Sequence, residues 1–106
     1  MNNFDNFVKS VIEKAIGDKA SCSDLISAQD PYFVIQRSDS AYEFRVFVPS
    51  VLSIEYEQKH KELLQTPYDF NSIDSSTTLG QTKINLTKAI KEFLDEKPAS
   101  SFYIRG

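Results

Sequence analysis

Carboxylates supply most of the groups in this sequence that could do chemistry. The chain holds 15 Asp and Glu residues but one histidine, His60, and one cysteine, Cys22. A cysteine nucleophile would need these two side chains to meet, and neither has a glycine-rich oxyanion segment beside it. One His and one Cys also supply too few ligands for a tetrahedral zinc site. We therefore expect no catalytic residues and no metal site.

Phosphate-binding and calcium-binding motifs are also missing from the sequence. The three glycines, at positions 17, 80 and 106, form neither a phosphate loop nor a dinucleotide fingerprint. Asp69, Asn71 and Asp74 do not follow the spacing of a calcium-binding loop. The sequence therefore predicts a protein that is not an enzyme and needs no cofactor.

An acidic and aromatic segment, residues 62–82, is the best candidate for a binding site. It holds three carboxylates and no Lys or Arg, and two aromatic residues flank its central Asp. Aromatic anchors ringed by carboxylates suit a basic protein surface, because rings give contact area and carboxylates pair with Arg or Lys. We predict these partner-binding residues: Glu62, Tyr68, Asp69, Phe70 and Asp74. Alternatively, the aromatic residues fold back and pin a long connection onto the core.

The overall charge indicates what kind of partner this chain would meet. Its net charge of −3 disfavours approach to a nucleic-acid backbone and favours a basic protein, although such a charge is also ordinary for solubility.

The cellular compartment is indicated by the cysteine content and by the lack of long apolar runs. A single cysteine excludes an intrachain disulfide and fits a reducing compartment. No apolar run reaches membrane-span length, and residues 1–5 lack the features of a signal peptide. We expect a cytoplasmic protein that binds neither membrane nor nucleic acid.

Two segments carry strong periodic patterns that would position these groups. Apolar residues recur at helical spacing over residues 3–16, with Asn2 or Asn3 as a cap and Gly17 at the end. Residues 32–37 and 42–48 alternate like the strands of a β-hairpin. One hairpin face is a predicted core face: Phe33, Ile35, Tyr42, Phe44, Val46 and Val48. The other face is mixed: Val34, Gln36, Glu43, Arg45 and Phe47.

The remaining segments give weaker patterns. Residues 18–31 are polar and predict at most one helical turn, around Leu25 and Ile26. Residues 49–65 fit either a helix or a strand, and the length of the apolar stripe favours a helix over 52–65. A connection over 66–83 then precedes a helix capped by Asn85, and residues 102–105 form a terminal strand. These elements predict a single α+β domain, 1–106, in which an antiparallel sheet of three or more strands (hairpin 32–48 plus the C-terminal strand) packs against two to three helices.

In size, acidity and lack of a catalytic motif, the whole chain resembles bacterial toxin immunity proteins, including those of contact-dependent growth inhibition. This resemblance implies a protein that neutralises a toxin domain, for example a nuclease, by occluding its active site. We expect a monomer or weak dimer. The resemblance is carried by overall character, so it assigns no residue. A phage-encoded inhibitor of a host defence nuclease would look similar. Two other classes remain open: a homodimeric chaperone or adaptor like those of type III secretion, with Phe47 and Val34 in an apolar dimer patch, and a small enzyme with His60 as general base.

Overall fold

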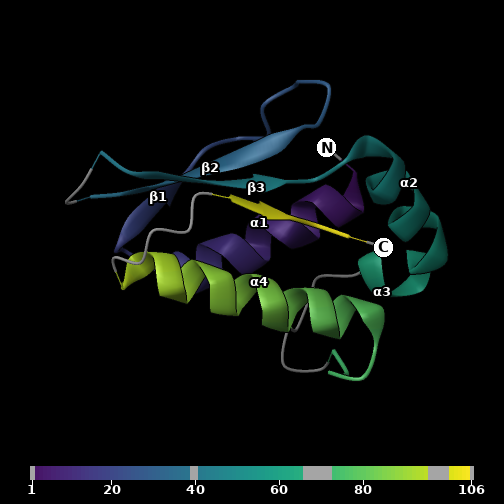
Figure 1. Cartoon of the computed structure of the whole chain (residues 1–106). Helices are drawn as coiled ribbons and strands as arrows, with labels where there is room; N and C mark the ends of the chain where they lie inside the picture. The colour runs from purple at the N-terminus through teal and green to yellow at the C-terminus, as the bar shows by residue number, and fades with distance from the viewer. Residues whose placement is uncertain (1, 39–40, 66–72, 96–100, 106) are drawn as a thin grey trace.

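The structure is a computed structural model that describes residues 2–38, 41–65, 73–95 and 101–105. Within these residues, four helices and a four-stranded sheet follow one another as α1 (Asn3–Ile16), β1 (Ala20–Cys22), β2 (Tyr32–Arg37), β3 (Glu43–Phe47), α2 (Ser50–Lys59), α3 (Lys61–Gln65), α4 (Thr78–Leu94) and β4 (Ser101–Tyr103). Helices α1 and α4 cover one face of the sheet, and α2 and α3 lie beyond one end of it (Figure 1). The predicted α+β class is confirmed.

Helix α1 forms where the periodic pattern predicts it. The Asn2 side chain accepts a hydrogen bond from the Asp5 backbone N–H (2.8 Å), and the Asp5 carboxylate accepts one from the Asn2 backbone N–H (3.3 Å). This reciprocal capping box satisfies two amide groups at the start of the helix. Gly17 ends the helix with a φ of 54°, a conformation in which a β-carbon would be strained. The buried face of the helix is its apolar stripe: Phe4, Phe7, Val8, Val11, Ile12 and Ile16.

The β2–β3 hairpin pairs in the predicted register, with Phe33 opposite Val46 and Ile35 opposite Phe44 on the core face. The prediction that Tyr42 lies on this face is wrong, because β3 begins at Glu43 and Tyr42 is 73% exposed. Arg37, at the end of β2, is instead the last buried residue on this face of the hairpin and is only 7% exposed. Its guanidinium Nη1 donates to the carbonyl oxygen of Phe93 in the last turn of α4 (2.9 Å).

The two edge strands of the sheet, β1 and β4, differ from the prediction. The C-terminal strand does join the hairpin, but β4 runs parallel to β3 because the three helices between them return the chain to the end where β3 began. The polar segment 18–31 does not form the expected helical turn. Residues 20–22 pair with β2, and Ile26 bridges to Tyr32. Backbone pairing with the free edge of β2 decides the conformation of a segment whose local pattern is weak.

The helices after the hairpin begin earlier than predicted. The helical reading of residues 49–65 is confirmed, but the helix starts at Ser50 and is interrupted at His60, which separates α2 from α3. The expected end of the connection at residue 83 and the expected Asn85 cap are wrong, and residues 66–72 of that connection lie outside the described residues. Helix α4 begins at Thr78, and the Thr77 side chain caps it by accepting from the Gly80 N–H (3.0 Å). The apolar stripe of α4 thereby extends back to Leu79, which is fully buried.

The core lies between the sheet and its helices. Phe44 and Phe93 are in contact there, with ring centroids 5.2 Å apart, and join β3 to α4. The opposite face of the sheet carries no described helix, so the side chains that alternate with the core residues are directed away from the helices. No described helix is long and apolar enough to cross a membrane.

Candidate protein-binding surface

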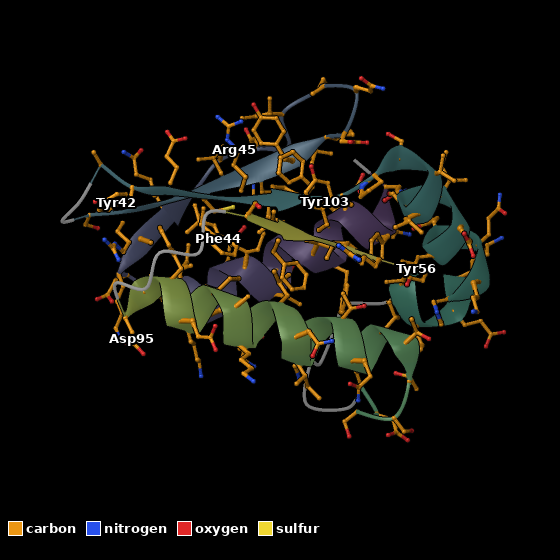
Figure 2. The ribbon with its side chains drawn as sticks, in the orientation of Figure 1. Tyr42, Phe44, Arg45, Tyr56, Asp95 and Tyr103 are labelled. Carbon is orange, nitrogen blue, oxygen red and sulfur yellow. The ribbon has the colours of Figure 1, made fainter. Side chains whose placement is uncertain are left out.

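The open face of the sheet presents three cross-strand rows of side chains. Figure 2 shows Arg45 on this face and Phe44 on the other, between the sheet and the helices. Strand register defines an aromatic row, Tyr32, Phe47 and Tyr103; a middle row, Val34, Arg45 and Ser101; and a polar row, Ser21, Gln36 and Glu43. Register therefore gathers onto one surface residues from four separate parts of the sequence.

The aromatic row is held by ring contacts between neighbouring strands. The Tyr32 and Phe47 centroids lie 5.3 Å apart with the ring planes tilted by 46°. The Phe47 and Tyr103 rings stack at 4.3 Å with their planes only 7° apart. Cross-strand aromatic pairs stabilise a sheet and also restrict each other's rotamers. The row is consequently a rigid apolar surface, with Tyr103 still 43% exposed at its outer end.

Arg45 adds a positive charge beside the row. Its guanidinium carbon lies 4.9 Å from the centroid of the Tyr32 ring, within the range of a cation–π interaction. Glu43, two residues earlier on β3, places a carboxylate oxygen 3.9 Å from the Arg45 guanidinium nitrogen. Both side chains remain about half exposed, at 48% for Arg45 and 46% for Glu43, so each can still reach a partner.

The orientation of the rings favours protein side chains over nucleic-acid bases. Surfaces that bind single-stranded nucleic acid offer open ring faces on which bases stack. In the aromatic row, Phe47 has a ring neighbour on each side, and Tyr32 lies between Phe47 and the Arg45 guanidinium. The outer face of Tyr103 is the exception. The row therefore offers mainly ring edges and tyrosine hydroxyls, which suit contacts with another protein.

Two of the acidic residues predicted from the sequence, Glu62 and Asp74, lie away from the open face. Glu62 is exposed on α3, and Asp74 is exposed in the turn before α4. The Asp74 carboxylate accepts from the Ser76 backbone N–H and from the Ser76 hydroxyl, both at 2.9 Å, and these bonds lower its pKa. Asp74 thus shapes the start of α4. Tyr68, Asp69 and Phe70 fall outside the described residues. Partner binding by these five residues stays a prediction.

Cys22 and His60, which the sequence raised as possible reactive groups, occupy different environments. Burial raises the pKa of the Cys22 thiol to about 11, so the thiol is protonated at neutral pH and is a poor nucleophile. His60 ends α2, and its ring centroid lies 5.9 Å from that of Tyr56. Burial, and then the charge of Lys59, lower the pKa of His60. The described residues contain no group of three or more His, Cys, Asp or Glu that could hold a metal ion.

Part of this surface was visible in the sequence. Alternation in the hairpin placed Val34, Arg45 and Phe47 on the second sheet face, and the register confirms it. The aromatic row itself was missed, because the contribution of Tyr103 depends on a parallel pairing between distant segments. Comparisons of the chain with protein families, with curated proteins and with solved structures find no match.

Proposed function

We propose that this chain is a non-enzymatic inhibitor, of the immunity-protein kind, that binds and neutralises another protein with the open face of its sheet. The observation that carries the proposal is the aromatic row of Tyr32, Phe47 and Tyr103 with Arg45 beside it. Tyr and Arg are among the residues that most often dominate binding energy in protein interfaces. Apolar side chains gathered on a sheet face that no described helix covers are typical of a protein-binding surface, so their presence there supports a binding role.

The stacked arrangement also favours tight binding for an entropic reason. Ordering a flexible side chain on association costs about 0.5–1.5 kcal/mol. The rings of Phe47 and Tyr103 already restrain each other in the free protein. The partner then meets a surface whose largest side chains lose little further freedom.

The net charge of −3 supports a basic partner, of which a toxin nuclease domain is one example. Complementary charge mainly raises the rate of association, and salt weakens it. We therefore expect an association rate that falls as ionic strength rises, whereas the dissociation rate, set by the aromatic row, changes less.

The proposal is tested by replacing one tyrosine of the row and one tyrosine outside it. A photoreactive amino acid in place of Val34 on the open face first captures the partner, and purified partner is then titrated calorimetrically. We expect Tyr103→Ala to weaken binding at least about tenfold. The matched control Tyr42→Ala removes an equally large and more exposed ring, 73% against 43%, and should change affinity less than about twofold. Equal losses in the two variants would contradict an interface on the open face.

A second function is favoured by one specific observation. Val34 and Phe47, the pair expected in a homodimeric chaperone or adaptor, do lie on the same open face. In that case the open face would meet a second copy of the chain. Light scattering distinguishes the two functions: a monomer that forms a one-to-one complex supports the inhibitor, and a stable dimer that Arg45→Glu dissociates supports the chaperone.

A further inference from the structure

A pocket of about 230 Å³ lies between the start of α1, the segment before β2 and the first turns of α2. Its polar lining includes Asn2, Asp5 and Ser53, and most of its other lining side chains are apolar. We propose that this pocket receives a lysine or arginine side chain of the partner protein. The proposal deepens the function proposed above, because the natural occupant would come from that same partner.

The polar end of the pocket is a buried carboxylate with unused hydrogen-bonding capacity. Asp5 is 7% exposed. One of its oxygens accepts from the Ser53 hydroxyl (2.7 Å) and the other from the Asn2 backbone N–H (3.3 Å). A carboxylate accepts about four hydrogen bonds, so beyond these donors from the described residues each oxygen has capacity for one more. An ammonium or guanidinium group supplies such donors together with the opposite charge.

A network of hydrogen bonds fixes this carboxylate in place. The Asn2 side-chain amide donates to the Ser53 hydroxyl oxygen (2.7 Å), and that hydroxyl in turn donates to Asp5. The Asn2 side-chain oxygen Oδ1 accepts from the Asp5 backbone N–H. The three residues join the first turn of α1 to α2. A cationic group therefore meets an acceptor that needs no reorganisation.

The electrostatic balance around the pocket favours a cation. The N-terminal ends of α1 and α2 both lie here, and each carries about half a positive charge. Two carboxylates outweigh them: that of Asp5, which lines the pocket, and that of Glu57, which is outside the lining and accepts from the Phe4 backbone N–H (3.0 Å). Among the described residues, no Lys, Arg or His lines the pocket to neutralise the remaining negative charge.

The walls of the pocket are apolar and suit the methylene groups of a Lys or Arg side chain. Leu25, Pro31, Val48 and Ile54 provide apolar contacts for the methylene groups, while the charged head reaches the carboxylate. Val51 precedes Ile54 by three residues on α2, a spacing that places the two side chains on neighbouring parts of the helix surface, and it is 77% exposed.

The pocket lies beside the end of the β2–β3 pair that carries the aromatic row. Pro31 immediately precedes Tyr32, Val48 immediately follows Phe47, and the Val48 N–H donates to the Pro31 carbonyl oxygen (2.7 Å). A partner that covers the aromatic row therefore needs to reach only past the end of β2 and β3 to insert a side chain.

The test uses small cations and the whole chain, so it needs no partner. Nitrogen-15-labelled protein is titrated with butylguanidinium and with butylamine, and 1-pentanol and butyrate serve as neutral and anionic controls. We expect both cations to produce saturable shifts at the amides of Asp5, Ser53 and Ile54, with millimolar dissociation constants. Asp5→Asn should weaken this binding at least about tenfold, whereas Asp95→Asn, which removes the same charge at the C-terminal end of α4 and does not line the pocket, should not.

The folding of each variant is checked by thermal unfolding. If Asp5→Asn fails to fold, Ser50→Trp decides the question, because it obstructs the pocket from an exposed position and leaves Asp5 intact. Shifts that are absent, that are equal in wild type and the pocket variant, or that appear equally with 1-pentanol or butyrate would overturn the proposal. Such results would not contradict the proposed interface on the open face, because Tyr103→Ala tests that interface separately.

Discussion

Arg37 provides the sharpest test of how this fold is held together. It lies on β2, is 7% exposed, and donates from Nη1 to the carbonyl oxygen of Phe93 (2.9 Å). Its guanidinium carbon also lies 5.0 Å from the centroid of the Phe93 ring. Because Phe93 is in the last turn of α4, the positive charge meets the negative end of the helix dipole. One side chain thus fastens the end of α4 to the sheet.

The structure allows the effect of Arg37→Met to be estimated. A hydrogen bond from a charged group contributes about 1.5–3 kcal/mol, and a partly desolvated cation–π contact about 1–2 kcal/mol. Methionine restores part of the apolar packing. We therefore expect the free energy of unfolding to fall by about 3 kcal/mol, which corresponds to a decrease in Tm of roughly 12 °C.

The measurement is urea unfolding followed by circular dichroism, with Arg45→Met as the matched control. Arg45 also has a ring beside it, that of Tyr32 at 4.9 Å, but its side chain is 48% exposed. Its replacement should change the free energy of unfolding by less than about 1 kcal/mol. If the two variants lose the same stability, the burial of Arg37 at the end of α4 is not what stabilises the fold.

Two further predictions concern the turn before α4 and the single histidine. Gly80→Ala should lower the free energy of unfolding by about 2 kcal/mol or more, because the new β-carbon would overlap the carbonyl oxygen of Asp74. Gly17→Ala has open space and should lose only about 1 kcal/mol through its φ of 54°; a larger loss here than at position 80 would contradict the steric argument. For His60, burial and a neighbouring lysine lower the folded-state pKa below the ordinary 6.5, so the unfolded chain takes up the proton first as the pH falls. Thermal stability should therefore decline from pH 7.5 to pH 5 in wild type and decline less in His60→Gln; equal declines would exclude this histidine as the cause.

Local sequence was sufficient to predict a helix or strand and its bounds wherever the apolar pattern agreed with the residues that begin and end the element. The α1 stripe has an Asn cap before it and a glycine after it, so its bounds followed directly from the sequence. The β2–β3 hairpin was predictable for a similar reason. Side chains alternate with a period of two, and one register alone buries Phe33, Ile35, Phe44 and Val46 together. The α+β class follows from these two elements.

Tertiary structure decided whatever depends on partners distant in the chain. Residues 20–22 become a strand because β2 offers a free edge, and β4 runs parallel to β3 because three helices intervene. Hairpin alternation assigned Phe47 to the second sheet face, but no local pattern shows that Tyr103 stacks on it. Equally, no spacing shows that Ser53 holds the carboxylate of Asp5. Periodicity records which way a side chain points, whereas its neighbour across the fold is fixed only when the strands and helices pack.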